Sequence, residues 1–194
     1  MNYQSNHTIQ RIRTPEELDD VFYHGFFEVY SDCFSDEPYF QRFSLERVKE
    51  DFYAMMSHGV FLCLRESNGR VDAFVAGLPL QNHGVLKDAL EFTNHQIDVN
   101  VIASYWYHSE IGVPKRLRGK GHARRLWDEV LRLMPSGYIK ILARTHKDNN
   151  DSLKMHERFG FVCIPGSEHI VVDGDYDNPD HKPEDDTRVF LIRG

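Results

Sequence analysis

The stretch YWYHSEIGVPKRLRGKGHARR, residues 105–125, decides the fold. Its aromatic and β-branched residues up to Val113 predict a strand, which Pro114 ends because proline cannot donate to a sheet ladder. A basic loop with Gly119 and Gly121 follows, and a helix begins at about Gly121. The helix has apolar residues on one face: Ala123, Leu126, Trp127, Val130, Leu131 and Met134. The free N–H groups of a helix's first turn favour an anion, so we expect a phosphate or pyrophosphate site here.

Two widely used phosphate-binding patterns do not fit this loop. The P-loop needs GxxxxGK[ST], and no Gly-Lys-Ser or Gly-Lys-Thr occurs in the chain. The dinucleotide pattern GxGxxG fails because Gly119 and Gly121 are followed by His-Ala-Arg, which lacks the third glycine. A nucleotide-binding protein of either class is therefore excluded.

Length, charge and cysteine content indicate an ordinary globular protein. The 194 residues suffice for one buried core, and 41% are hydrophobic and 27% charged. The net charge of 23 − 30 = −7 argues against nucleic-acid binding. No apolar run or signal-peptide core indicates a membrane partner or export. The three cysteines are scattered and lack CxxC spacing, so we expect reduced thiols, no metal site and a cytoplasmic location.

The rest of the chain predicts helices and strands around this stretch. Thr14 and Glu17 form a capping box that begins one helix, which continues through Tyr30 and ends before the break Asp36-Glu37-Pro38. Ser44 caps a second helix, whose inward residues are Leu45, Val48, Phe52, Met55 and Met56. The expected strands cover residues 7–13, 60–64, 71–78, 138–144, 161–164 and 187–192. A helical insertion at residues 81–100, with Val85, Ala89, Phe92 and Gln96 on one face, and a short helix at residues 152–159 complete the series.

Two motifs resemble the GNAT superfamily of N-acetyltransferases. Residues 118–123 read R-x-x-G-x-A, which is similar to the family's acetyl-CoA loop Q/R-x-x-G-x-G/A; residues 116–121 fit as well, so the register is open by two residues. Residues 149–161 read N-x-x-S-x-x-x-H-x-x-x-G-F, which is similar to the second signature N-x-x-[AS]-x-x-x-Y-x-x-x-G-F. The motifs cover about half of the chain, and the order of elements extends the resemblance over nearly all of it.

The resemblance implies a fold and a cofactor site. The expected fold is α/β, a mixed central sheet of about seven strands flanked by about four helices, with the helical insertion between the third and fourth strands. A single N-acetyltransferase domain would span residues 1–194. Acetyl-CoA would bind as co-substrate to the strand end, the loop and the short helix: Ile111, Gly112, Val113, Arg118, Gly119, Lys120, Gly121, His122, Ala123, Arg124, Asn149 and Ser152. Asn149 could equally be only a helix cap.

The catalytic candidates are His156, Glu110 and His108. His156 stands where the family often has a tyrosine that acts as general acid, and it could donate to the leaving sulfur or only pack beside the cofactor. Period-2 alternation places Trp106, His108 and Glu110 on one side of the central strand. Glu110 is the first candidate for the base, directly or through water, and His108 the second. The H-x-E pair lacks the Pro-Cys-x-x-Cys half of a deaminase metal site.

These observations predict an enzyme that transfers an acetyl group from acetyl-CoA to an amine by direct attack in a ternary complex. The rival is a non-catalytic CoA-binding or regulatory module with the same fold, which the histidine at position 156 keeps open. The acceptor could be a small-molecule amine or a peptide amine. The oligomeric state is open, with a homodimer as one possibility.

Overall fold

The computed structural model describes residues 7–93, 97–171 and 186–194, which form two compact units. Within these residues, unit one comprises Met1–Cys33, Ser44–Gly77 and Glu110–Met134. Unit two comprises Phe34–Phe43, Leu78–Ser109 and Pro135–Gly194. The single domain over residues 1–194 stays a prediction.

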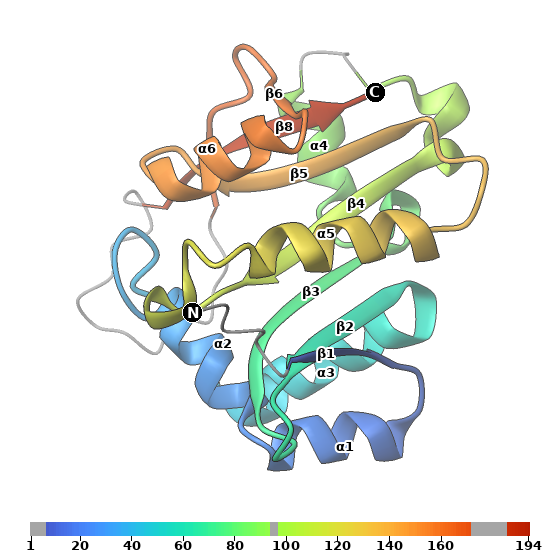
Figure 1. The fold of residues 1–194 in the computed structure, drawn as a ribbon. Helices are drawn as coiled ribbons and strands as arrows, with labels where there is room; N and C mark the ends of the chain where they lie inside the picture. Colours follow the sequence, from blue (N-terminus) through green and yellow to red (C-terminus); the bar gives the residue numbers. More distant parts are fainter. Residues whose placement is uncertain (1–6, 94–96, 172–185) are drawn as a thin grey trace. The chain divides into compact units, whose positions relative to one another are not determined.

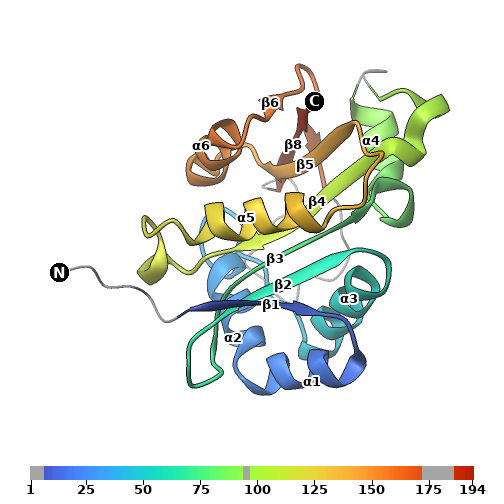
Figure 2. The same ribbon diagram turned by 45° about the vertical axis from the view of Figure 1, so that its right-hand side comes forward.

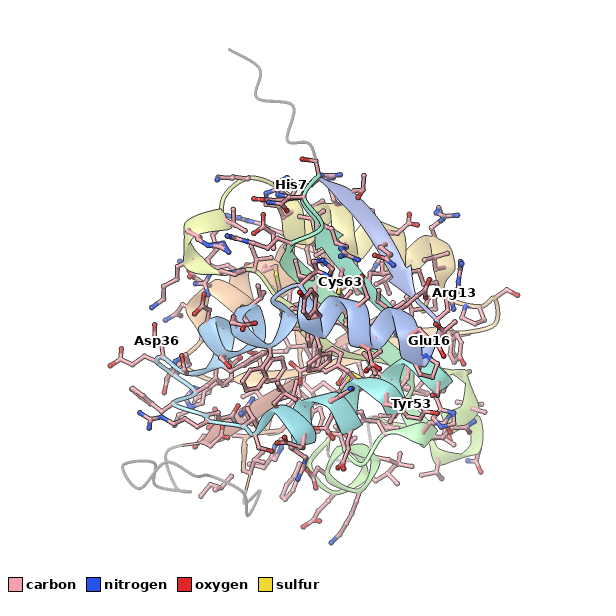
Figure 3. The ribbon with its side chains drawn as sticks, turned by 90° about the horizontal axis from the view of Figure 1, so that it is seen from below. His7, Arg13, Glu16, Asp36, Tyr53 and Cys63 are labelled. Carbon is pink, nitrogen blue, oxygen red and sulfur yellow. The ribbon has the colours of Figure 1, made fainter. Side chains whose placement is uncertain are left out.

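Unit one contains the N-terminal strands and most of the large helices (Figure 1). Its elements are β1 (Thr8–Ile12), α1 (Pro15–Tyr23), α2 (Phe26–Phe34), α3 (Leu45–His58), β2 (Val60–Arg65), β3 (Val71–Pro79), η3 (Lys115–Leu117) and α5 (His122–Leu133). The last residue of α2 and the last two of β3 belong to unit two. The strands β1, β2 and β3 are antiparallel neighbours. Figures 2 and 3 show α1, α2 and α3 on one face of these strands and α5 on the other. Both α3 and α5 contact β2.

Unit two contains the parallel pair of strands and the short helix α6. Its elements are η1 (Leu80–Asn82), α4 (Leu86–Phe92), η2 (Val99–Ser104), β4 (Tyr105–Gly112), β5 (Lys140–His146), α6 (Asn150–Arg158), β6 (Val162–Cys163), β7 (His169–Ile170) and β8 (Thr187–Arg193). Strand β4 begins in unit two, and its last three residues belong to unit one. Strand β5 pairs in parallel with β4 and antiparallel with β8, which also pairs with β6 and β7.

These pairings confirm the predicted mixed α/β fold. The predicted hairpin between β2 and β3 is present, because the amide of Glu66 donates to the carbonyl of Arg70 across the Asn68-Gly69 turn. The predicted cap of α1 is present as well: Thr14 Oγ1 accepts from the amide of Glu17, and the Glu17 carboxylate accepts from the amide of Arg13, one residue before the cap. Ser44 caps α3 through the amide of Arg47.

An aromatic cluster forms the core of unit one. Phe26 of α2 lies with its ring centroid 4.7 Å from Phe52 of α3, 5.2 Å from Phe61 of β2 and 5.0 Å from Phe74 of β3. All four side chains are buried. Phenylalanine side chains bury large apolar areas, so this cluster ties two helices to two strands and sets the position of β3, from which the loop of the candidate site is anchored.

Two sequence predictions about helices are wrong in detail. The single helix expected from Pro15 to Tyr30 is two helices, because Gly25 adopts φ +91° and ends α1 in the left-handed conformation that glycine tolerates. The apolar spacing continues across this break, since residues of both helices face the same core. Leu45, expected inward, is 42% exposed because it occupies the first turn of α3.

The insertion at residues 81–100 contains α4 and short 3₁₀ turns rather than one long helix. Val85 and Ala89 of the predicted common face are buried, whereas Gln96 lies outside the described residues. Arg144 of β5 holds α4 through an ion pair with Asp88 at 2.9 Å. Most of the acidic segment that precedes β8 also lies outside the described residues. None of the helices in the described ranges is both long enough and apolar enough to span a membrane.

Candidate functional site

The loop between η3 and α5, where the sequence predicts an anion-binding site, has free space beside its two glycines. Gly119 has φ +76° and Gly121 has φ +81°, the left-handed region in which side chains other than glycine are strained. A Cβ added to either residue would meet no heavy atom within 4 Å. Gly121 is the N-cap of α5 and supplies no side-chain acceptor. The loop therefore leaves space for a ligand to approach its backbone.

The backbone amides of this loop are available to a ligand. Within the described part of the chain, the N–H groups of residues 119–124 donate to no protein acceptor. Four orphan donors are normal for a helix N-terminus, and here two further amides precede them. The helix dipole and the exposed side chain of Lys120 make the surroundings positive. Six successive donors of this kind suit the oxygens of a phosphate or pyrophosphate.

Buried Asp72 of β3 anchors the base of the loop. Its carboxylate accepts from His7 at 2.7 Å, from Arg70 at 3.1 Å and from Arg116 of η3 at 3.2 Å. Burial would raise the pKa of Asp72, but the hydrogen bonds from His7 and Arg70 outweigh it and hold the pKa below its ordinary value. At the end of β4, Gly112 packs too closely against Phe74 to carry a side chain, because a Cβ there would come within 2.2 Å of the Phe74 ring.

The same corner groups His7, Glu66 and Asp72, whose ligand-type atoms lie within 4.8 Å of one another. One Asp72 oxygen faces Arg70 and Arg116, and the other faces His7. Two guanidinium groups already neutralise this carboxylate, and they would repel a cation. We interpret the group as an ion-pair network that holds the loop.

In unit two, the first turn of α6 is closed by hydrogen bonds. Asn149 caps the helix: its Oδ1 accepts from the amide of Ser152 at 3.0 Å, and its Nδ2 donates to the hydroxyl of Tyr39 at 3.0 Å. Ser152 Oγ accepts from Thr145 of β5 at 2.9 Å. Asn149 is therefore a helix cap in the structure. Contact of Asn149 or Ser152 with acetyl-CoA stays a prediction.

His156 is buried on the same helix and lies beside His108 of β4. The two ring centroids are 5.6 Å apart, and the Phe161 ring is 5.1 Å from His156. His156 Nδ1 lies 2.8 Å from the carbonyl oxygen of Ser152, one turn earlier. Burial lowers the pKa of His156, an effect partly offset by this hydrogen bond, and burial lowers the pKa of His108 further.

Comparison with known proteins identifies the family. A model of the acetyltransferase (GNAT) family matches residues 22–161. The chain belongs to the GNAT acetyltransferase family. The search of curated proteins finds no match.

Solved structures share the GNAT fold at low sequence identity. One is a protein assigned as a phosphinothricin N-acetyltransferase, with 19% identity, a TM-score of 0.61, and coverage of 96% of this chain and 97% of the other. Another is yncA of Salmonella typhimurium, assigned as an acetyltransferase and solved with its cofactor acetyl-CoA, with 17% identity, a TM-score of 0.59 and coverage of 97% and 93%. Naa20 of Chaetomium thermophilum, solved with a bisubstrate analogue, has 13% identity, a TM-score of 0.58 and coverage of 96% and 85%.

The structure divides the predicted GNAT site residues between the two units. Glu110 and the loop residues belong to unit one, whereas His108, Asn149, Ser152 and His156 belong to unit two. Along β4, Trp106 and His108 are buried and Glu110 is half-buried. The base role of Glu110 or His108 stays a prediction.

Cys33 of unit one does not supply a nucleophile at neutral pH. Burial raises the pKa of its thiol to about 12, with Glu110 and Asp32 adding to the effect and Arg118 opposing it. The thiolate, which is the reactive form, is then scarce. Direct attack by the acceptor, without an acyl-cysteine, fits this finding.

The sequence reasoning missed Tyr39 and Thr145, which bond to Asn149, to Ser152 and to each other. Neither residue lies in a GNAT motif, and Tyr39 stands 106 positions from Thr145. A tyrosine after the Asp36-Glu37-Pro38 break carries no local signal of such a contact. Only the fold brings the two hydroxyls together.

Proposed function

We propose that this GNAT protein transfers an acetyl group from acetyl-CoA to an amine. The observation that carries the proposal is the run of six amides at residues 119–124 that donate to no acceptor among the described residues, in a loop whose glycines leave room for a ligand. These amides would hold the pyrophosphate, with Lys120 adding positive charge. The family membership supplies the reaction class.

Acetyl-CoA would supply an acetyl group activated as a thioester. The amine nitrogen attacks the carbonyl carbon, a C–N bond forms, the C–S bond breaks, and the electron pair leaves with the sulfur. The protein would bind and orient the reactants, and a backbone N–H at the end of β4, among Ile111, Gly112 and Val113, would polarise the carbonyl. The thiolate needs a proton, and the amine must lose one.

The acceptor is an amine that reaches the enzyme as an ammonium ion and reacts as the neutral base. We expect a small-molecule or peptide amine, because attack needs an unhindered nitrogen. The residues that select it are not identified by either motif, since both motifs are matched to the cofactor.

The proposal is tested by incubating the chain with acetyl-CoA and a panel of amines: polyamines, amino acids, and peptides with free N-termini or lysines. Mass spectrometry should show a product heavier by one acetyl group, and DTNB should detect an equal amount of CoA thiol. Because Cys163 is exposed and would react with DTNB, each reading is corrected with a sample that lacks amine.

Acetyl-CoA binding is measured on the same samples by calorimetry. Binding without acetylation of any amine would support the non-catalytic CoA-binding module instead. Absence of acetyl-CoA binding would contradict both functions.

A further inference from the structure

A chain of three hydroxyl groups, two of them buried and that of Ser152 half-buried, leads to the helix turn that holds His156. Tyr39 Oη lies 3.1 Å from Thr145 Oγ1, Thr145 Oγ1 lies 2.9 Å from Ser152 Oγ, and Ser152 Oγ lies 3.2 Å from His156 Nδ1. Asn149 Nδ2 donates to Tyr39 Oη at 3.0 Å. Thr145 and His156 are 1% and 3% exposed, and all five residues belong to unit two.

The donor and acceptor roles in this chain follow from its two ends. The Asn149 amide nitrogen can only donate, so Tyr39 accepts from it and keeps its own hydrogen for Thr145. Thr145 then donates to Ser152. Each hydroxyl therefore has a defined partner, and the side chains of the first turn of α6 are held in one arrangement.

The carbonyl of Ser152 decides the tautomer of His156. A carbonyl oxygen can only accept, so a contact of 2.8 Å to Nδ1 requires the hydrogen on Nδ1. A neutral imidazole carries one N–H, which leaves the lone pair on Nε2. Neutral His156 is therefore a hydrogen-bond acceptor at Nε2 and cannot donate from that atom.

We propose that His156 takes the proton of the acceptor amine at Nε2, and that Tyr39 and Thr145 are positioning residues that hold the α6 turn behind it. This inference rests on the proposed function. A neutral amine would form the C–N bond and transfer one proton to Nε2 while the C–S bond breaks. The resulting imidazolium would return that proton to the CoA thiolate, so protons and electron pairs balance without another reactant. The first proton of the ammonium ion leaves to water beforehand.

Among the described residues, the titratable groups beside this arrangement are His108 next to His156, the phenol of Tyr39 itself, and Arg188 and His146 against the Tyr39 ring. Buried His108 is neutral at neutral pH because burial and the neighbouring His156 lower its pKa. Burial also lowers the pKa of His156 below its ordinary value. A base works when neutral, so kcat/KM, calculated on the concentration of neutral amine, should rise with pH through this lowered pKa and then level off. A donor at Nε2 would give the opposite slope.

The tautomer is tested without any activity measurement. Histidine labelled with ¹⁵N is introduced into the full chain, and long-range ¹H–¹⁵N spectra are recorded at neutral pH. The His156 signals are those that vanish in His156→Gln and persist in the control His58→Gln, which alters an exposed histidine at the end of α3. We expect the unprotonated nitrogen to be Nε2. An unprotonated Nδ1 would overturn the proposal.

The kinetic role is tested with an amine that the enzyme acetylates. His156→Gln should lower kcat by about 10²–10⁴-fold and leave acetyl-CoA affinity nearly unchanged. It should also remove the acidic limb from the profile of kcat/KM calculated on the concentration of neutral amine. Thr145→Val and Tyr39→Phe should each lower kcat by about 3- to 10-fold, and Thr145→Ser should restore most of it. An equal loss in Thr145→Ser, or an acidic limb that persists in His156→Gln, would overturn the assignment.

Failure of this inference and failure of the proposed function give different results. If no amine is acetylated, the proposed function fails whatever the tautomer. If amines are acetylated and the His156 variant keeps its rate, the function stands and His156 only packs beside its neighbours.

Discussion

Two helices of this protein begin in opposite ways. Helix α5 of unit one starts at Gly121, which supplies no side-chain cap, and the amides of residues 119–124 are left without protein acceptors in the described structure. Helix α6 of unit two starts at Asn149, whose side chain accepts from the amide of Ser152 and donates to Tyr39. The first N-terminus is open to a ligand, and the second is closed by the protein itself.

The difference separates two tasks. Orphan amides cost little at an exposed helix end and can be satisfied by an anion, so the uncapped end of α5 suits binding. A capped end is rigid, so the first turn of α6 suits the support of a side chain held in one orientation, which is the proposed requirement for His156. The following substitutions close the open N-terminus of α5, weaken the anchor of its loop, or remove the cap of α6.

The largest effect should come from giving α5 the kind of cap that α6 has. In Gly121→Asp the new carboxylate can accept from the open amides and repels a pyrophosphate, and aspartate tolerates the left-handed conformation better than most residues. We expect acetyl-CoA affinity to fall about 100-fold, or about 2.7 kcal/mol, with the fold retained. Calorimetry and thermal unfolding measure the two properties. Gly121→Asn, which adds no charge, should lose clearly less affinity, and equal losses would contradict the electrostatic reason.

The next effect concerns the anchor beneath the open loop. Asp72→Asn removes a buried carboxylate that accepts from His7, Arg70 and Arg116, and hydrogen bonds to charged groups contribute about 1.5–3 kcal/mol. We expect unfolding free energy at neutral pH to drop by about 2 kcal/mol and acetyl-CoA affinity to fall several-fold, because Arg116 is released.

The ion-pair network of Asp72 also predicts how the unfolding free energy changes with pH. The pKa of Asp72 is depressed in the folded chain, so its contribution is present above the unfolded pKa of about 3.9 and is lost as the pH falls through the folded pKa. Urea unfolding from neutral to acidic pH should therefore show less acid destabilisation in Asp72→Asn than in the wild type. Identical acid profiles would contradict the network.

The smallest effect tests the closed helix end. Asn149→Ala should cost about 1 kcal/mol of stability, as N-cap removal usually does. Ser44→Ala removes the matching cap of α3 and should cost about the same. Only Asn149→Ala should also lower kcat, by several-fold, because only that turn supports His156. Equal kcat values in the two variants would show that the cap has no role beyond folding.

The order of the helices and strands and the glycine-bearing loop before α5 could be predicted from the sequence, because both depend on local patterns. The strand before Pro114, the glycines at 119 and 121 and the apolar face of α5 are all readable from residues close together in the chain. The break at Gly25 was missed because the apolar spacing of α1 continues into α2. The order of motifs predicted the family, which the match over residues 22–161 confirms.

The support of His156 could not be predicted, because it depends on contacts between distant residues. The hydroxyls of Tyr39 and Thr145 meet only once β5 and the segment after α2 are in place. The tautomer of His156 could not be predicted from the motif either. The motif specifies which residue stands at position 156 but not the contact of its Nδ1 with the carbonyl of Ser152. The proton-donor role expected from the motif stays a prediction, and the base role proposed above is its alternative.

The central claim is that the amides of residues 119–124 bind the pyrophosphate of acetyl-CoA. The most direct measurement follows these amides in ¹H–¹⁵N spectra of the full chain during a titration with acetyl-CoA. We predict large shifts for these six amides with one common dissociation constant, while the amide of Arg47, already bonded to the cap Ser44, stays unchanged. Loop amides that keep their positions while acetyl-CoA binds would contradict the account.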